Sequence, residues 1–360
     1  MDEGDIDILG VFYMANINAI LFQIQALSQP EQKNIAESIL KTLKGESSFE
    51  DSSSARNPVC RKCGSETGIS KYGKDKNGNQ RFRCNHCGTV FTATSYSVIS
   101  HSHCDLSKWE KYIECLLLGL SLEKCSILCD ISIRTAFLWR HKILSILQND
   151  QTNRVLSGIV ETDDMFFSVS YKGNHKNSTH FVMPRDPHKR GTDTKVPPSA
   201  KTCVLCAVER GGQSYGEVMG IGVVNSAKLD YAFKNRLCHD ALVVSDKAHP
   251  IKSYFMHSPN ELVQVASHVG KLGSPPEIKG TFHIQNVNNM HSRIRSFMRG
   301  YNGVSTKYLN HYISLFVWIE NYKKVSDINF EKELMTKMRQ SNTYISAKII
   351  TSLPIIPSVA

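Results

Sequence analysis

Four cysteines, arranged as two identical pairs, constrain what the front of this 360-residue chain can fold into. Cys60 and Cys63 form one CxxC pair, Cys84 and Cys87 form the other, and a glycine follows each pair. Two thiolates on such a turn can reach one metal ion, and two turns complete a tetrahedral site. The segment between the pairs has no core of its own, so metal binding would supply its folding energy. The pattern predicts a structural zinc ribbon over residues 57–94. The alternative of redox-active or free thiols does not explain the repeated spacing.

The remaining cysteines are predicted to be core residues rather than ligands. The chain has eleven cysteines, an odd number, which suits a reducing compartment better than a disulfide framework. Cys203 and Cys206 fall in a predicted strand, where positions three apart point to opposite faces. Cys125 and Cys129 are expected to be buried in a helix. Because no stretch is long and apolar enough for a membrane helix and no signal peptide is evident, we expect a cytoplasmic, nucleoid-associated protein.

The net charge of +10 and the pI near 9.0 favour an anionic partner, of which nucleic acid is the commonest. Charge alone equally allows a basic protein without such a partner. Basic residues are concentrated around the predicted ribbon: Lys62, Lys71, Lys74, Lys76, Arg81 and Arg83. We therefore expect the ribbon to contact DNA, the alternative being a solvated charged surface.

Residues 105–150 are predicted to form a helix-turn-helix. The first helix ends near Cys129, and Ser132 is placed to cap the second. Polar and basic residues near the start of a second helix are what reading the major groove requires. The expected DNA contacts in this segment are Arg134, Arg140 and Lys142. A plain helical connector is the alternative, because short helix pairs are common.

Beyond residue 157 the sequence changes to short apolar runs. The expected strands span residues 158–171, 202–209, 216–225, 241–245 and 261–266. The expected helices span residues 228–237, 249–256, 283–299 and 305–322. This order indicates an α/β domain over residues 157–325, and the ribonuclease H-like fold has this order. Residues 1–50 are predicted to form a helical N-terminal arm, with a capping box at Ser28 and Glu31. Residues 326–360 are interpreted as a C-terminal extension.

Two carboxylates follow apolar strands in this domain. Asp163 lies within the first strand and Asp246 ends a later one. A carboxylate in a central strand is costly unless it binds something, and two that meet across adjacent strands can hold divalent cations. Asn288 shares a polar helix stripe with Arg295 and Arg299, which suits a metal site beside a phosphodiester. For each aspartate taken alone, the alternative interpretation is a turn residue or a helix cap. For the polar stripe, the alternative is a solvent-exposed helix face.

The chain resembles the insertion-sequence transposases with a zinc ribbon and an ISXO-type transposase domain, in the DDE/D superfamily. The resemblance covers roughly residues 57–322. It is carried by the CxxC pairs and by Ser132–Leu144, Val160–Phe167, Lys172–Lys176, Met183–Arg185, Lys189–Gly191, Val244–Asp246, His283–Arg293 and Gly303–Leu309. The combination in this order is specific, although each piece alone is not.

The resemblance implies a catalytic, magnesium-binding triad of Asp163, Asp246 and Asn288, with two Mg²⁺ ions or Mn²⁺ in their place. The third position is usually Glu in the superfamily, so its identity stays open among Asn288, Asn286 and Asn289. Family members show Glu where this chain has Asp164. Lys307 matches a basic position that touches the transposon end in related transposases.

The implied activity is cleavage of terminal inverted repeats followed by strand transfer into target DNA, by a homodimer or larger assembly. Residues 172–201 form a basic insertion that we expect to contact the DNA backbone, unless it is merely a solvated loop. Its expected contacts are Lys172, Lys176, Arg185, Lys189 and Arg190. Two rivals remain: a non-catalytic DNA-binding regulator derived from a transposase, and a structure-specific nuclease without strand transfer.

Overall fold

The computed structural model describes residues 28–33, 58–60, 62–75, 78–151, 154–173, 197–266, 278–323, 329–341 and 345–357. The chain divides into two units, residues 1–58 and residues 59–360. In the first unit, residues 28–33 form a helical turn in which the Ser28 N–H donates to Glu31 Oε2 at 3.0 Å. This contact confirms the predicted cap. The rest of the predicted N-terminal arm lies outside the described residues.

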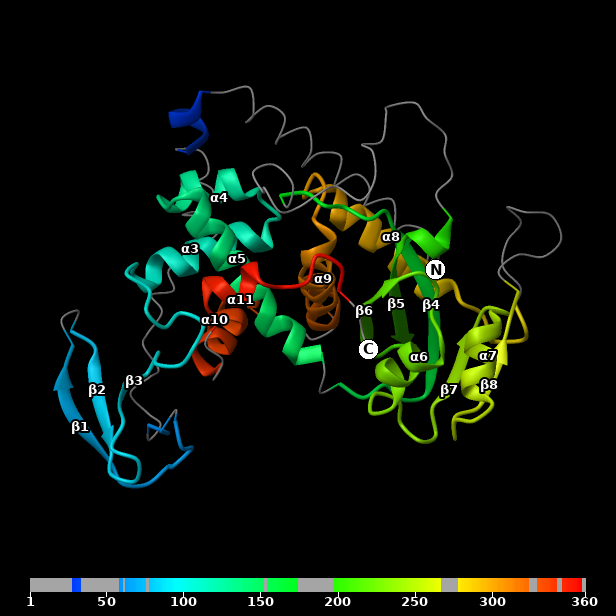
Figure 1. Ribbon diagram of the computed structural model, residues 1–360, viewed down its shortest axis with the longest axis horizontal. Coiled ribbons are helices and arrows are strands. Elements are labelled where there is room, and N and C mark those ends of the chain that lie inside the picture. Colours follow the sequence, from blue (N-terminus) through cyan, green and yellow to red (C-terminus); the bar gives the residue numbers. More distant parts are fainter. Residues whose placement is uncertain are drawn as a thin grey trace, which may run out of the picture. The chain divides into compact units, whose positions relative to one another are not determined.

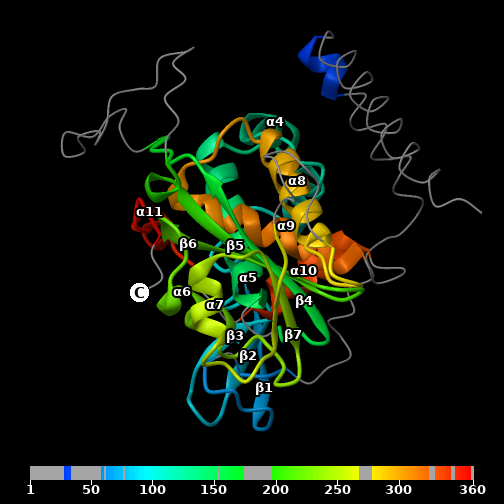
Figure 2. The same cartoon turned by 90° about the vertical axis from the view of Figure 1, so that its right-hand side faces the viewer.

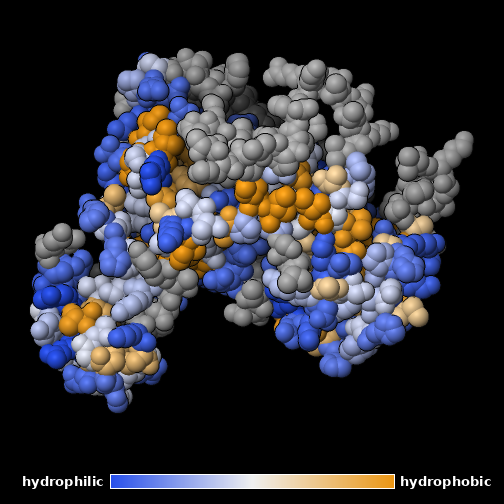
Figure 3. Space-filling model, viewed as in Figure 1, coloured by the Kyte–Doolittle hydropathy of each residue, from blue (hydrophilic) through white to orange (hydrophobic). Residues whose placement is uncertain are grey.

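A three-stranded antiparallel sheet follows the first cysteine pair (Figure 1). Its strands are β1 (Ile69–Lys74), β2 (Gln80–Cys84) and β3 (Val90–Thr92). The buried core of this module consists of Cys60, Cys84 and Phe91, with a few half-buried neighbours. The module's surface is largely hydrophilic, broken by small hydrophobic areas (Figure 3). A core this small agrees with a module whose fold depends on a metal.

Three helices follow: α3 (Leu106–Leu117), α4 (Leu122–Cys129) and α5 (Ile133–Gln151), of which α4 and α5 cover the segment that was expected to be a helix-turn-helix. Asp130 ends α4 in the left-handed conformation, with a φ of 51°. Ser132 Oγ accepts a hydrogen bond from the Thr135 N–H at 3.0 Å, so it caps α5 as predicted. Trp109 of α3 stacks on Trp139 of α5 with 3.7 Å between ring centroids.

Two C-terminal helices complete this helical core, and the sequence reading did not identify them. They are α10 (Phe330–Gln340) and α11 (Ala347–Thr351). Leu334 and Met338 of α10 and Ile350 of α11 belong to the same buried cluster as Trp109. The described part of the predicted extension is therefore an integral part of the helical core.

The α/β domain contains a five-stranded sheet in the order β6-β5-β4-β7-β8, which can be followed in Figure 1; Figure 2 shows the same sheet from the side of β7. Its strands are β4 (Ile159–Phe167), β5 (Thr202–Glu209), β6 (Ser214–Ile221), β7 (Leu242–Ser245) and β8 (Leu262–Gln264). The β4, β5 and β6 strands pair antiparallel, whereas β7 and β8 run parallel to β4. A central first strand, an antiparallel meander on one side and parallel strands on the other is the ribonuclease H-like order, which confirms the predicted fold.

Helices cover both faces of this sheet. On one face lie α6 (Ser226–Phe233) and α7 (His249–Phe255), which pack with the sheet in one buried cluster. On the other face lie α8 (Gln285–Arg299) and α9 (Leu309–Lys323), with the short 3-10 helix η3 (Thr306–Tyr308) between them. Cys203 is buried under α6 and α7 and Cys206 under α8 and α9, as the strand alternation predicted.

The α9 helix also packs against α5 and so joins the α/β domain to the helical core. Its residues Ile313 and Val317 belong to the cluster under the sheet, whereas Leu315 and Trp318 belong to the cluster around α3 and α5. No helix among the described residues has the length and apolar character needed to cross a membrane.

Candidate functional site

Asp163 and Asp246 occupy neighbouring positions on two parallel strands. The paired register of β4 and β7 ends at Thr162 and Ser245; Asp163 is the next residue of β4, and Asp246 is the residue that directly follows β7. Positions in register on adjacent strands share a face of the sheet. Asp163 lies two residues before Met165, which is buried under α8 and α9, so the pair belongs to that face.

The pKa of Asp163 reflects its burial and the other carboxylates close to it. Burial, together with the negative charges of Asp246 and Asp164, raises the pKa of Asp163 to about 7, although Arg295 acts in the opposite direction. Burial and Asp246 also raise the pKa of Asp164 to about 6. A divalent cation would relieve this repulsion, and carboxylate oxygens are the ligands that Mg²⁺ and Mn²⁺ prefer. The donor set therefore fits a hard cation.

The α8 helix supplies the residues that face Asp163. His291 Nδ1 lies 3.8 Å from Asp163 Oδ2, and the charge of Arg295 acts on the same carboxyl group. Asn288 precedes His291 by about one helical turn and Arg295 by about two, so all three lie along one flank of α8. The sequence reading placed Asn288 and Arg295 on this stripe but assigned nothing to His291.

The structure distinguishes the three asparagines at the start of α8. Asn288 is half-buried, whereas Asn289 is exposed. Asn286 Nδ2 donates to Glu161 Oε1 at 2.7 Å and is therefore already engaged. Of the three, Asn288 has the position that best suits a ligand beside Asp163.

Glu161 is a buried acid that the sequence reading passed over. Its side chain is fully buried, two residues before Asp163 on β4, and Arg210 Nε donates to its Oε1 at 2.9 Å. The signal was present in the sequence as a charged residue inside an apolar strand. Such a residue is costly unless its charge is compensated.

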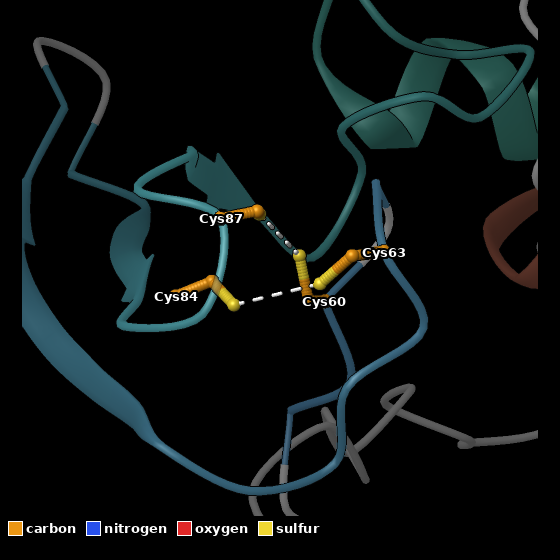
Figure 4. A group of neighbouring side chains, drawn as sticks. All are labelled: Cys60, Cys63, Cys84 and Cys87. Carbon is orange, nitrogen blue, oxygen red and sulfur yellow. Dashed lines mark hydrogen bonds between the residues drawn. The ribbon is translucent and has the colours of Figure 1, made fainter.

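The four predicted zinc ligands meet at one point (Figure 4). Cys60 Sγ lies 3.6 Å from Cys87 Sγ, and Cys63 Sγ lies 3.7 Å from Cys84 Sγ. A tetrahedral zinc ion with Zn–S bonds of about 2.3 Å sets its sulfur atoms ~3.8 Å apart. The spacing therefore fits one four-coordinate ion, and four protein ligands leave no open position for chemistry. The predicted metal-binding cluster is confirmed.

The predicted DNA contacts of the helix-turn-helix have different environments. Arg134 is exposed near the start of α5. Arg140 is only 1% exposed, and its Nη2 donates to the Leu120 carbonyl at 2.6 Å and to Cys125 Sγ at 3.3 Å. A guanidinium buried in this way cannot reach a phosphate, so the prediction of DNA contact is wrong for Arg140. Lys142 is half-buried and donates to a backbone carbonyl at 3.3 Å.

Two further predicted contacts are engaged within the chain. Lys172 Nζ donates to the carbonyls of Asn302 and Gly303 at 3.1 and 3.0 Å, and Lys307 Nζ donates to the Thr351 carbonyl at 2.6 Å. By contrast, the α8 residues Arg295 and Arg299 are exposed. Four predicted contacts lie outside the described residues: Lys176, Arg185, Lys189 and Arg190.

Comparison with known proteins gives one family match. Residues 155–321 match the ISXO2-like transposase domain. No curated protein matches the chain. The family match confirms the resemblance that the sequence motifs predicted.

Several solved structures also match. A chain in the crystal structure of the Mos1 strand transfer complex is 14% identical, with 67% of this chain and 78% of that chain covered and a TM-score of 0.23. A chain in a pre-cleavage Mos1 transpososome is 13% identical, with 69% and 82% covered and a TM-score of 0.19.

Proposed function

Because residues 155–321 form an ISXO2-like transposase domain, we propose that this chain is the DNA transposase of a bacterial insertion sequence. It cuts a phosphodiester at each end of the element and joins the freed 3′-hydroxyl to target DNA. The main support is the register of β4 and β7, because it brings Asp163 beside Asp246 on the face that α8 covers.

Asp163, Asp246 and Asn288 are the proposed ligands of two Mg²⁺ ions, with Mn²⁺ as a substitute. When bound, such a pair of ions activates the attacking oxygen and stabilises the leaving one. The two aspartates supply the carboxylate oxygens and Asn288 supplies a neutral amide oxygen. A ligand set with two carboxylates carries one negative charge fewer than a set with Glu at the third position. We therefore expect this site to bind divalent cations more weakly.

The α8 helix provides the groups that hold DNA beside these ligands. Arg295 lies close enough to act electrostatically on Asp163, and its exposed guanidinium is suited to bind a non-bridging phosphate oxygen. Arg299 follows about one turn later on the same exposed stripe and extends this contact along the backbone. Burial and the charge of Arg295 lower the pKa of His291 to about 4, so this residue is neutral at physiological pH.

Binding of the terminal repeats is assigned to the ribbon and the helix-turn-helix. In the ribbon, the guanidinium carbons of Arg81 and Arg83 lie 5.5 and 5.7 Å from the ring centroid of Tyr72, which orders two cations on one sheet. In the helix-turn-helix, Arg134 is exposed at the capped start of α5. The four cysteines hold a structural Zn²⁺ ion. Because two ends must be joined, the active form is a homodimer or larger.

The experiment that tests this function is a cleavage assay on DNA that carries the element's terminal repeats. Asp163→Asn and Asp246→Asn should each lower the Mg²⁺-dependent cleavage rate by at least ~100-fold, because each replaces a charged carboxylate ligand by a neutral amide and leaves the site with a single carboxylate among the proposed ligands. Asp230→Asn is the matched control: it removes an exposed acid on α6, on the opposite face of the sheet, and should leave cleavage unchanged.

Further assays of the same protein distinguish the transposase from the two alternative functions. A pre-cut end should be joined to a plasmid by the wild type, and failure to join despite cleavage would favour a structure-specific nuclease. Binding of the repeats without divalent-dependent cleavage would favour the non-catalytic regulator, whereas cleavage that survives Asp163→Asn would refute Asp163 as a ligand of the catalytic ions.

A further inference from the structure

The N-terminus of α8 is capped by a residue of the sheet rather than by its own sequence. Ile284 occupies the N-cap position and makes no side-chain cap. Instead, Glu161 of β4 accepts hydrogen bonds from the backbone N–H groups of Asn286 at 2.8 Å and Val287 at 3.3 Å. A carboxylate at this end also interacts favourably with the helix dipole. The first turn of α8 is thus bound to the central strand.

Arg210 extends the same attachment to the segment before α8. This residue lies in the turn after β5. Its Nε donates to Glu161, while Nη1 and Nη2 donate to the carbonyls of Thr281 at 2.6 Å and His283 at 3.3 Å. A single Glu161–Arg210 ion pair therefore joins β4, the β5–β6 turn and the approach to α8.

Asn288 lies between two points at which α8 is held to β4. The first point is Glu161, which holds residues 286 and 287 by hydrogen bonds, and the second is the packing of the buried His291 ring beside β4, with its Nδ1 3.8 Å from Asp163 Oδ2. Both acids project from the same face of β4, because they are two residues apart. A helix fixed on either side of a residue has little freedom to rotate or slide there. The attachment at Glu161 therefore determines how far Asn288 lies from Asp163.

Burying the Glu161 carboxylate costs free energy, which argues that the position it gives to α8 is important. A fully buried carboxylate is expensive even when it is paired, and a shape-matched apolar residue is often as stabilising. A local Ser or Asn cap could satisfy the first turn of α8 without burying a charge. What the buried ion pair adds is a fixed relation between the strand that carries Asp163 and the helix that carries Asn288.

We propose that Glu161, together with Arg210, is a positioning residue of the active site. It holds the first turn of α8 on β4 and so sets the reach of Asn288 toward the cation bound by Asp163 and Asp246. The inference rests on the proposed function above, and it extends the site to two residues that touch neither cation nor DNA.

The test measures Mn²⁺ binding directly, with the full-length protein and no DNA, by electron paramagnetic resonance titration. Asp163→Asn defines the signal that belongs to this site. Glu161→Gln keeps the side-chain volume but removes the charge, and it should raise the Mn²⁺ dissociation constant by about tenfold or more, as the loss of an outer-shell partner does. Saturating Mn²⁺ should restore part of the cleavage rate.

Glu217→Gln is the matched control for the loss of a buried ion pair. Glu217 lies 3.7 Å from Arg236, is 8% exposed, and belongs to β6 rather than to the approach to α8. This variant should lose stability without a change in Mn²⁺ affinity. Arg210→Gln provides a second route if Glu161→Gln does not fold, because it leaves the contacts of Glu161 with α8 in place. It should weaken Mn²⁺ binding to a smaller extent.

Three results would overturn the proposal. One is an unchanged Mn²⁺ affinity in Glu161→Gln and Arg210→Gln; another is an equal loss in Glu217→Gln. The third is the absence of an Asp163-dependent Mn²⁺ site in the wild type. A wild type that binds Mn²⁺ through Asp163 but cuts no DNA would refute the proposed function alone, and the positioning role would still be decided by the binding data.

Discussion

The Nδ1 atoms of His141 on α5 and His311 on α9 lie 2.8 Å apart in the protein interior. One Nδ1 must donate and the other must accept, so the two rings cannot both be protonated while this contact is kept. Burial, followed by the charges of His311, Arg140 and Lys307, lowers the pKa of His141, and burial lowers that of His311. The pair lies where the helical core meets the α/β domain, so its protonation state bears on the contact between them.

We expect the stability that this histidine pair contributes to be lost as the pH falls below the ordinary histidine pKa of about 6.5. In the unfolded chain both histidines bind a proton in this range, whereas in the folded protein they resist it. The unfolded state then binds more protons, so stability rises with pH across this window and falls on acidification. The slope should approach about 1.4 kcal/mol per pH unit for each excluded proton. Urea unfolding at a series of pH values from about 7.5 to about 5 measures this slope.

A double variant separates this pair from the rest of the chain. With His141→Gln and His311→Gln together, a hydrogen bond between the helices can persist without a titrating group, so the dependence of stability on pH should lose the share that the pair contributes. His257→Gln removes an exposed histidine at the end of α7 and should leave the slope as it is. A slope equal to that of the wild type would show that the pair does not contribute to it.

Removal of the ribbon metal should unfold the ribbon and leave the other cores intact. The ribbon's buried core is limited to Cys60, Cys84 and Phe91, so little else holds the three strands once the metal is lost. In Cys60→Ser, hydrogen exchange across β1–β3 should rise to the unfolded level, and zinc content should fall from one ion per chain to none. Cys238→Ser, at a cysteine outside the cluster, should retain the metal. Unchanged protection of β1–β3 in metal-free protein would contradict this prediction.

The sequence predicted the position of the two aspartates because each follows a strand whose apolar run is easy to recognise. The β5 strand was predicted with the bounds it has, and Asp163 within β4 and Asp246 directly after β7 belong to strands that the fold then paired. Their closeness could not be derived from the residues alone. It depends on the parallel pairing of β4 with β7, which joins segments about eighty residues apart.

Other features depended on tertiary contacts that a linear pattern does not contain. Arg140 looked like a DNA contact because it is basic and lies in the second helix, yet its helical face is turned to the core. Glu161 looked like an ordinary strand residue because its donors come from α8 and from Arg210, far along the chain. The α10 helix had local signals, with Asn329 as its cap and acidic residues in its first turn, and these were overlooked.

The contrast between Arg134 and Arg140 yields a paired prediction. Arg140→Ala should destabilise the protein by about 2–4 kcal/mol, because it leaves the Leu120 carbonyl without its donor and opens a cavity in the helical core. Arg134→Ala should change stability by no more than about 0.5 kcal/mol, since the side chain is exposed. The Arg134 variant should instead weaken binding to terminal-repeat DNA by about tenfold or more.

Urea unfolding and fluorescence anisotropy without added magnesium measure the two effects. Zinc must be retained in both assays, so no chelator is used. If Arg134→Ala binds the repeat DNA as tightly as the wild type, the start of α5 is not part of the DNA interface. If Arg140→Ala is as stable as the wild type, the buried guanidinium does not support the helical core.

Gly216 on β6 lies directly against α9. A Cβ atom at this position would lie 3.2 Å from Cγ2 of both Ile313 and Val317 of α9, tighter than ordinary contact. Both side chains are buried and have no room to yield, so Gly216→Ala should cost about 1–3 kcal/mol in the free energy of unfolding. Gly300→Ala is the control: its Cβ would meet only the Phe297 carbonyl oxygen at 3.5 Å, and its effect should stay within about 0.5 kcal/mol. Equal stability of the two variants in urea unfolding would mean that α9 can move away from β6 at little cost.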